Sequence, residues 1–322
     1  MREIGYSKRE LKEKELDALY DLNLGIIGAG NMASAILKGV IGKGLFAQIM
    51  VSAKTEESLK PWEEAGLIVT TDNKQVMMES EVIILAVKPQ SINEIMEEIG
   101  SYASGKCIVS IAAGITRRHL RHGLGEEAFL IRAMPNLSLS VGKGATAVTY
   151  GYGVPDPLYK AVLAAFEASG EVVLMHDKQL NDIMALNGSS PAYFFRMARA
   201  MMDWAKERGI DAEAALRLVG KSMEGAAAML LSGEHTAAEL TDQVCSKGGT
   251  TLAALSAFDE MKFDEMMAEA MTRCAKRGEE LSEELCDTPA DVSPGEILLM
   301  EQMSRRGAPP KSPLDSLILP GK

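Results

Sequence analysis

Long apolar runs are missing from this sequence. Stretches such as residues 82–87 last only a few residues before a lysine or a proline interrupts them. A helix that crosses a bilayer needs about 20 apolar residues in succession. The sequence therefore predicts no membrane-spanning helix, and we expect no membrane partner.

Cysteine is scarce and scattered. No CxxC or zinc-like spacing links the four cysteines, which are Cys107, Cys245, Cys274 and Cys286. Isolated thiols in a chain of 322 residues suit a reducing compartment. Residues 1–21 mix acids with bases, unlike a secretory signal or a transit peptide. We expect a charged, helical N-terminal extension and a cytoplasmic protein.

Positive charge and histidine are also in short supply. A net charge of −11 argues against a nucleic-acid binder, because phosphate neutralisation needs a basic surface. The four histidines show no HxxxH or HExxH spacing. We therefore expect neither a metal site nor histidine-based acid–base catalysis.

The N-terminal half carries the pattern of an α/β domain. Apolar residues make up 47% of the chain, enough for two modest cores. Short β-rich runs alternate with helical stretches over residues 22–176, which predicts a Rossmann-type dinucleotide-binding domain with a parallel sheet. Strands are expected at 22–27, 49–52, 82–87, 107–112, 129–134, 146–150 and 172–175, and helices near 32–43, 55–64, 91–100 and 157–168.

Residues 177–287 predict an all-α C-terminal domain. Pro191 suits a helix start, Gly209 a helix end, and Asp211 the cap of the next helix. Further helices are expected at 236–244, 250–258 and 264–285. Residues 288–322 hold six of the twelve prolines and predict a loose tail.

A glycine-rich turn follows the first expected strand. Gly28, Gly30 and Ala33 form G-x-G-x-x-A between a strand and a helix. This spacing gives a tight turn, lets a pyrophosphate approach the backbone and keeps helix and strand close. The helix N-terminus offers free N–H groups to the anion. An ordinary strand–helix turn is the alternative, but the context favours a dinucleotide site.

The end of the second expected strand lacks the Asp or Glu that would bind the ribose 2′-hydroxyl of NAD. Ser52, Lys54 and Thr55 stand there instead and suit a 2′-phosphate, so NADPH is favoured and NADH remains possible. In the alternative, Lys54 points into water and Glu56 or Glu57 binds the ribose.

Ligands bind beyond the carboxyl ends of parallel strands, so the ends of the third and fourth strands should line the nicotinamide half of the cofactor. The end of the fifth strand suits a cofactor or substrate contact. The third and fourth strands run into Lys88-Pro89 and Ala112. The fifth runs into Pro135-Asn136. Lys88 could instead be a solvated loop residue, and Pro135-Asn136 an ordinary turn.

Two clusters of small and hydroxyl residues precede helices in the second half: Asn187 to Pro191, and Ser246 to Thr251. Free N–H groups at a helix N-terminus bind a carboxylate. For the second cluster, a Gly-Gly hinge with a threonine cap is the alternative. A nicotinamide, an anion pocket and little acid–base machinery suit reduction of a protonated imine.

Taken together, GIIGAGNMASAILKG, AVKPQ, SIAAGI, RAMPN, GSSPAYFF and DQVCSKGGTTLAAL resemble pyrroline-5-carboxylate reductase in order and spacing over residues 22–285. The resemblance implies an oxidoreductase acting on CH–NH, which reduces 1-pyrroline-5-carboxylate to L-proline with NADPH in the last step of proline biosynthesis. It also implies that the all-α C-terminal domain is a dimerisation domain, which forms an interleaved homodimer and, in many members, larger rings of dimers.

The resemblance also implies site residues. Thr251 would hydrogen-bond or protonate the ring nitrogen, and positioning is favoured because threonine is a poor general acid. The substrate-binding residues would be Ser189, Gly248, Gly249, Thr250 and Thr251. The cofactor-binding residues would be Gly28, Gly30, Asn31, Met32, Ser52, Lys54, Ala86, Lys88, Pro89, Ala112 and Asn136.

The chain departs from the usual family pattern near the implied substrate site, at Leu137, Ser138, Ser190, Thr236 and Lys247. Lys247 adds a cation beside the implied carboxylate pocket. Two alternatives therefore stay open: a reductase of another carboxylated cyclic imine, and a catalytically silent nucleotide-binding regulatory paralogue.

Overall fold

The computed structural model describes residues 21–286. Nearly all of the expected N-terminal extension and the whole of the expected tail lie outside these residues. The contacts divide the described chain into two compact units, at Gly188/Ser189 and Cys274/Ala275. We call residues 21–188 with 275–286 the sheet unit, and residues 189–274 the helical unit. The predicted domain boundary, after residue 176, lies earlier in the chain than this division.

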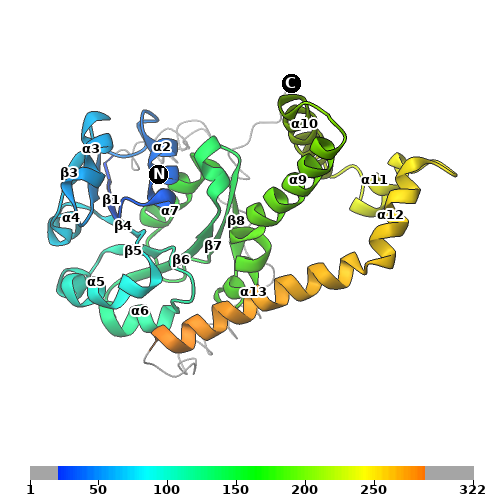
Figure 1. Cartoon of the computed structure of the whole chain (residues 1–322). Coiled ribbons are helices and arrows are strands. Elements are labelled where there is room, and N and C mark those ends of the chain that lie inside the picture. Colours follow the sequence, from blue (N-terminus) through cyan, green and yellow to red (C-terminus); the bar gives the residue numbers. More distant parts are fainter. Residues whose placement is uncertain (1–20, 287–322) are drawn as a thin grey trace, which may run out of the picture. The chain divides into compact units, whose positions relative to one another are not determined.

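An eight-stranded sheet forms the centre of the sheet unit (Figure 1). Its strand order is β3-β2-β1-β4-β5-β6-β7-β8. The strands are β1 (Asn23–Ile27), β2 (Gln48–Ser52), β3 (Ile68–Thr70), β4 (Val82–Leu85), β5 (Cys107–Ser110), β6 (Phe129–Pro135), β7 (Gly144–Thr149) and β8 (Gly170–Met175). Parallel pairing from β3 to β6 confirms the predicted Rossmann-type arrangement.

Helices cover both faces of this sheet, and the central strand β4 is apolar at every position. In β4, Val82 and Ile84 join one core cluster, whereas Ile83 and Leu85 join the other. This division follows from the alternation of side chains along a strand. On the first face lie α2 (Asn31–Val40), α3 (Glu56–Glu64) and α7 (Asp156–Glu167), and on the second α4 (Asn73–Glu79), α5 (Ile92–Ile99) and α6 (Arg117–Leu124).

Two parts of this unit differ from the sequence-based prediction. β7 runs antiparallel to β6. The segment between them, which includes the short helix Leu137–Val141, is too short for the crossover of a dozen or more residues that parallel strands need. The prediction also omitted β3, α4 and α6, since β3 has three residues and α4 seven, lengths too short for a clear periodic pattern.

The helical region begins with short turns and continues in long helices. Asp177–Gln179, α8 (Leu180–Ile183) and the π-helical turn Met184–Gly188 still belong to the sheet unit. The helical unit contains α9 (Ser190–Glu207), α10 (Ala212–Leu231), α11 (Ala237–Val244), α12 (Thr250–Glu260) and the first half of α13 (Phe263–Leu285). Pro191 in the first turn of α9 and the Asp211 cap of α10 confirm the predicted helix starts.

Candidate active site

The glycine turn after β1 is built as the sequence predicts. Gly28 has a φ of +105° and donates its N–H to the Ser52 carbonyl at 2.9 Å. A Cβ added at Gly28 would lie 2.6 Å from the Ala86 carbonyl oxygen, so only glycine fits between β1 and β4. Ala33 is fully buried beneath the turn, which keeps α2 close to the sheet.

The N-terminus of α2 fits a bound pyrophosphate. Gly30 is the exposed cap residue, and no described atom lies within 4 Å of a Cβ added there. Within residues 21–286, no side chain hydrogen-bonds to this cap, and the first turn, which starts with Asn31 and Met32, carries no acid. The first N–H groups of a helix lack intrahelical partners and favour an anion. The turn therefore leaves both the room and the donors that a pyrophosphate needs.

At the end of β2, a relay of hydrogen bonds joins three elements. Ser52 is fully buried, and its hydroxyl donates to Asn73 Oδ1 at 2.7 Å. The Asn73 amide nitrogen donates to Glu98 Oε2 at 2.8 Å. The Ser52 hydroxyl proton is therefore used inside the protein, and Asn73 and Glu98 lie beside Ser52 at the end of β2. Sequence reasoning missed both residues, since they are brought there from α4 and α5.

Lys54 also has a partner from α5. Its Nζ lies 3.0 Å from Glu94 Oε2, and both side chains are exposed, at 72% and 68%. Glu56 and Glu57, the alternative ribose ligands, lie in the first turn of α3 and are exposed. The end of β2 itself lacks an acid, but the fold supplies acids from a neighbouring helix.

The residues expected around the nicotinamide lie at the carboxyl ends of β4 and β5. Ala86 donates its N–H to the Ile27 carbonyl at 2.8 Å, which holds the end of β4 beside the glycine turn. Lys88 is exposed, and Pro89 begins a short helical turn. Ala112 is nearly buried after β5. These positions share one edge of the sheet with Gly28, as predicted.

The Asn136 side chain is buried and hydrogen-bonded within the protein, and it is not exposed to solvent. It is nearly buried, its Oδ1 accepts from the Ala145 N–H at 3.3 Å, and its Nδ2 donates to Asn187 Oδ1 at 2.9 Å. Asn187 in turn donates to the carbonyls of Met134 and Ala145. The two asparagines therefore fasten the RAMPN strand end to the π-helical turn. A nicotinamide contact of Asn136 stays a prediction.

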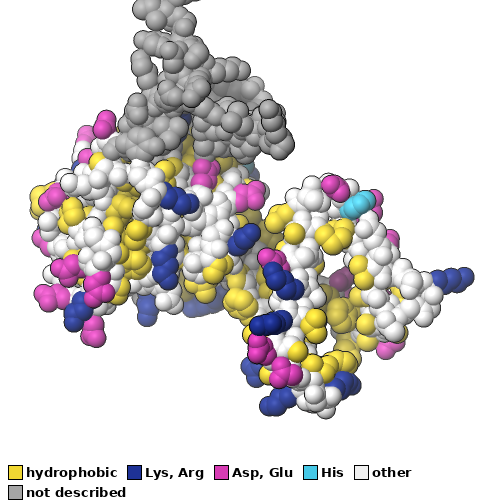
Figure 2. Space-filling model, turned by 90° about the horizontal axis from the view of Figure 1, so that it is seen from above, with side chains coloured by type: hydrophobic (Ala, Val, Ile, Leu, Met, Phe, Trp, Pro, Cys, Tyr) yellow, Lys and Arg dark blue, Asp and Glu magenta, His cyan; other side chains and the backbone are white. Residues whose placement is uncertain are grey.

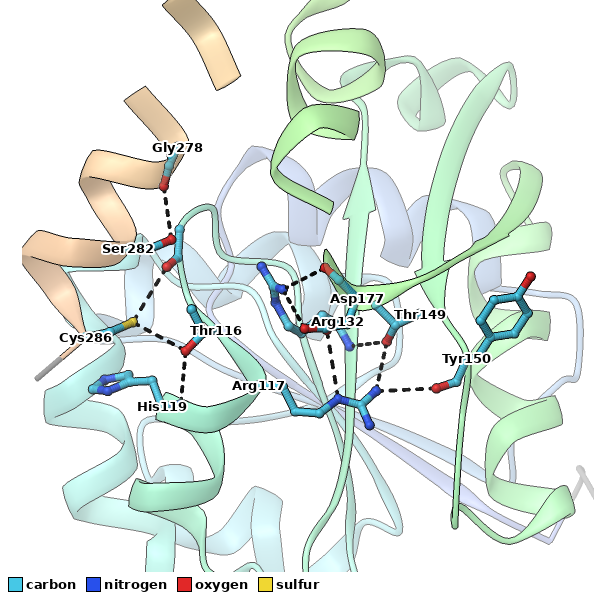
Figure 3. A network of polar contacts seen from close by, with 11 residues as sticks. Thr116, Arg117, His119, Arg132, Thr149, Tyr150, Asp177, Gly278, Ser282 and Cys286 are labelled. Carbon is cyan, nitrogen blue, oxygen red and sulfur yellow. Dashed lines mark hydrogen bonds and ion pairs between the residues drawn. The ribbon is translucent and has the colours of Figure 1, made fainter. Parts of the chain in front are cut away.

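A partly buried ion-pair network joins β6, β7 and α6 to the start of the helical region (Figure 3). Arg132, whose side chain is 5% exposed, pairs with Asp177 Oδ2 at 3.2 Å. Arg117 Nε lies 3.9 Å from the other carboxylate oxygen, and its Nη2 donates to Thr149 Oγ1. Thr149 also accepts from the Arg132 N–H. This network fixes the start of the helical region to β6 and β7.

The end of α13 is fastened to the same unit. The Cys286 thiol donates to the Gly114 carbonyl at 3.7 Å and accepts from the Thr116 hydroxyl at 3.8 Å (Figure 3). Thr116 in turn caps α6 by accepting the His119 N–H. The SIAAGI segment thus contacts the last turn of α13, which explains why these residues belong to the sheet unit.

In the helical unit, the second small-residue cluster forms a turn into α12. Gly248 has a φ of +73°, and Gly249 donates its N–H to the Ser246 carbonyl at 2.8 Å. Gly249 is the cap residue, and no described side chain hydrogen-bonds to it. Thr250 and Thr251 begin the helix. The first N–H groups of α12 are thus in the position to bind an anion.

Ser189, in the first small-residue cluster, has a side-chain contact within the helical unit. The Cys274 thiol lies 3.3 Å from Ser189 Oγ, which links α13 to the residue before α9. Burial, followed by the neighbouring Cys274 thiol, raises the pKa of Tyr193. The Tyr193 hydroxyl therefore stays protonated at ordinary pH.

The remaining thiols and acids offer little further chemistry. All four cysteines are free, and burial raises the pKa of Cys107 to about 12, so this thiol stays protonated in the core. Within residues 21–286, no group of three or more His, Cys, Asp and Glu side chains is placed to hold a metal ion. No helix in the described part of the chain has the length and apolar character to cross a membrane.

Comparison with known protein families matches both parts of the chain. Residues 177–281 match the model described as pyrroline-5-carboxylate reductase dimerisation. Residues 23–114 match the model described as NADP oxidoreductase, coenzyme F420-dependent. The dimerisation match supports self-association of this chain as a dimer.

Individual relatives agree over most of the chain. Pyrroline-5-carboxylate reductase of Escherichia coli is 36% identical over 264 residues, which is 80% of this chain and 98% of the relative. The Arabidopsis thaliana enzyme of the same name is 34% identical over 265 residues, 81% of this chain and 95% of the relative.

Solved structures show the same fold. The pyrroline-5-carboxylate reductase of Coxiella burnetii has a TM-score of 0.74 at 33% identity, covering 81% of this chain and 98% of its own. The Plasmodium falciparum pyrroline carboxylate reductase, solved with NADP bound, has a TM-score of 0.75 at 22% identity, covering 82% and 99%. The motifs, the fold and these relatives lead to one conclusion: the chain belongs to the pyrroline-5-carboxylate reductase family.

Proposed function

We propose that this protein reduces 1-pyrroline-5-carboxylate to L-proline by hydride transfer from NADPH. The observation that carries the proposal is the pair of helix N-termini with glycine caps, at α2 and α12, whose free N–H groups can bind anions. Relatives named pyrroline-5-carboxylate reductase support it. A nicotinamide bound at the first of these N-termini supplies the hydride. The protonated imine of the substrate already accepts hydride readily, so the protein has mainly to position both reactants.

The cofactor roles follow from the edge of the sheet. Gly28, Gly30, Asn31 and Met32 receive the pyrophosphate at the N-terminus of α2. Ser52 and Lys54 act at the adenosine ribose, Ser52 through Asn73 because its own hydroxyl proton is used there. The nicotinamide side is formed by Ala86, Lys88, Pro89, Ala112 and Asn136.

The substrate roles belong to the helical unit. The N–H groups of Gly248, Gly249, Thr250 and Thr251 at the start of α12 bind the substrate carboxylate, with Ser189 as a further polar contact. The Thr251 hydroxyl hydrogen-bonds to the ring nitrogen and orients it. No described group with a histidine-like pKa is needed, because the imine arrives protonated.

The assembly and location extend what the comparisons support. We propose that the dimer interleaves helices of two helical units and that such dimers can close into rings. Interleaving would bury apolar side chains that a single copy leaves exposed. Four free cysteines without disulfide bonds suit the cytoplasm as the place of action.

A substrate and cofactor panel tests the proposal. Purified protein should oxidise NADPH with 1-pyrroline-5-carboxylate faster than with six-membered or other carboxylated cyclic imines. Preference for another imine would contradict this substrate and favour an adaptation around Lys247. Tight NADPH binding without turnover on any cyclic imine would instead indicate a silent nucleotide-binding paralogue.

A further inference from the structure

The end of β2 combines one cation with two acids from the same neighbouring helix. Lys54 pairs with Glu94 in the first turn of α5, and Glu98, one turn later, accepts the hydrogen bond of Asn73. Counting these three side chains gives a net charge of −1, from one lysine and two glutamates. In folds of this kind the adenosine ribose lies at the end of this strand. The ribose end is therefore not the plain cationic site that the sequence of β2 predicts.

This arrangement matters because the two nicotinamide cofactors differ only at that ribose. NADPH carries a 2′-phosphate with a charge of about −1.5 to −2 near neutral pH, whereas NADH carries a neutral hydroxyl. A carboxylate near the 2′-phosphate repels it, and a carboxylate near the hydroxyl can accept its hydrogen bond. The acids of α5 thus act against NADPH and have little effect on, or favour, NADH.

Glu94 is placed to act through Lys54. The two side chains are exposed, and such surface pairs are weak enough to open when a stronger partner arrives. A 2′-phosphate is such a partner, since it carries more charge and three acceptor oxygens. Binding NADPH then requires Lys54 to leave Glu94, while binding NADH does not. Glu98 differs because it contacts neutral Asn73 and orients that amide.

Resting on the proposed function, we infer that Glu94 is a specificity-determining residue, which competes with the 2′-phosphate of NADPH for Lys54. The ion pair lowers the affinity for the phosphorylated cofactor and leaves the affinity for the unphosphorylated one nearly unchanged. The chain is thereby tuned toward using both cofactors. An acid that lies 40 residues beyond Lys54 in sequence, on α5, sets this balance.

Calorimetric titration of the full-length protein with NADP+ and NAD+ tests the inference without turnover. Glu94→Gln should tighten NADP+ about threefold to tenfold and change NAD+ by less than about twofold, by removing one competing charge. Glu97→Gln is the matched control, because Glu97 is an exposed acid on the same helix. It should change the ratio of the two affinities by less than about twofold.

A double-substitution cycle tests the route through Lys54. In a Lys54→Met background, Glu94→Gln should no longer increase the affinity for NADP+, because the lysine for which Glu94 and the 2′-phosphate compete is gone. A full gain in that background would overturn the inference in favour of direct repulsion. An unchanged affinity ratio in Glu94→Gln alone, or an equal change in Glu97→Gln, would overturn it as well.

The outcomes separate this inference from the proposed function. If the wild-type protein binds neither NADP+ nor NAD+, the proposed function fails and the inference with it. The wild-type protein could instead bind both cofactors and reduce 1-pyrroline-5-carboxylate while Glu94→Gln leaves the ratio of the NADP+ and NAD+ affinities unchanged. In that case only the inference fails. The ratio of KM values for NADPH and NADH should follow the calorimetric ratio.

Discussion

The two units of this chain bury their apolar residues to very different extents. In the sheet unit, every residue of β4 and β5 is buried. In the helical unit, α9 and α10 leave large side chains exposed, including Phe195 at 64% and Leu218 at 68%. Figure 2 shows many apolar side chains on the surface of the helical unit. Among the described residues, the sheet unit has a large buried apolar core, whereas the helical unit buries few of its large apolar side chains.

This difference in burial suits two different tasks, dinucleotide binding in the sheet unit and chain association in the helical unit. A strand–turn–helix with a finished core can hold a dinucleotide rigidly, because its glycine turn is fixed by packing on both sides. Exposed apolar faces of this size mark an interface, and the dimerisation match covers the same residues. The dimerisation match and the proposed α12 anion site therefore both fall on residues of the helical unit, and the proposed α2 anion site falls on residues of the sheet unit.

Charging the exposed apolar face should have the largest effect. The double variant Phe195→Asp with Leu218→Asp places two carboxylates where we expect a partner helix. The dimer should weaken by about 1000-fold or more, as loss of two buried interface anchors implies. Sedimentation velocity across a dilution series measures it.

A matched variant in the sheet unit controls for the added charge. Met78→Asp changes a comparably exposed apolar residue, at 57%, on α4. It should leave the dimer intact. A dimer that survives the double variant, or that dissociates equally with Met78→Asp, would contradict the contrast between the units.

Removing Asp177 should cost about 3 kcal/mol of unfolding free energy, because it leaves the buried Arg132 guanidinium without its partner. Asp177 lies at the start of the dimerisation match but within the sheet unit. Urea unfolding of Asp177→Ala measures the loss. The control Glu269→Ala breaks an exposed pair with Arg273 on α13 and should cost about 0.5 kcal/mol or less. Equal losses of unfolding free energy in the two variants would show that the Arg132–Asp177 pair stabilises the fold no more than an exposed ion pair does.

Gly28→Ala should weaken NADP+ binding by about 30-fold or more, equivalent to about 2 kcal/mol of strain in the turn. The added methyl meets the Ala86 carbonyl at 2.6 Å while φ is +105°. Gly42→Ala is the control, since φ is +74° there but no described atom lies within 4 Å of the new Cβ. Cofactor titration of both variants separates lost backbone freedom from the collision, and similar binding by both would contradict the assigned turn.

Thr236→Ala should have the smallest effect, about 1 kcal/mol, by removing the cap of α11. Thr236 accepts the Glu239 N–H at 3.3 Å, and Glu239 accepts the Thr236 N–H at 2.7 Å. The Thr236 hydroxyl also donates to the Glu239 carboxylate, at 2.9 Å. The two hydrogen bonds that the carboxylate accepts, from the Thr236 N–H and from its hydroxyl, lower the pKa of Glu239 from its ordinary 4.5. A lowered acid pKa stabilises the fold above the ordinary value, and the benefit disappears as pH falls through the lowered one.

Thermal unfolding as a function of pH checks this cap. The difference between wild type and Thr236→Ala should be full near pH 7 and shrink once the pH falls below the ordinary Glu value of 4.5. A difference that grows toward acid pH would contradict the capping role of Glu239.

The sequence predicts the parts of this fold that depend on local patterns. The apolar run at β4, the glycine turn at Gly28 and the Pro191 start of α9 each carry their own signal, and each is confirmed. The sequence-based prediction omitted β3 and α4 because they are short, although Asp72 caps α4 by accepting the Lys74 N–H at 2.9 Å. Their presence depends on packing against β1 and β2.

The candidate site divides in the same way. Gly28 and Gly30 could be assigned from spacing because turn and helix are continuous in the chain. Glu94, Glu98 and Asn73 could not be placed near Ser52 from sequence, because α4 and α5 reach the end of β2 only after the sheet has formed. The partners of a site residue come from the fold, even when the residue itself is found by motif.

The most direct test of the account compares two readouts on one variant, Thr251→Ala. The account places Thr251 at the substrate in the helical unit and the cofactor in the sheet unit. NADPH oxidation with 1-pyrroline-5-carboxylate should therefore fall by about 100-fold, while the affinity for NADP+ stays within about twofold of wild type. An unchanged rate, or a loss of NADP+ affinity that accounts for the lower rate, would contradict it.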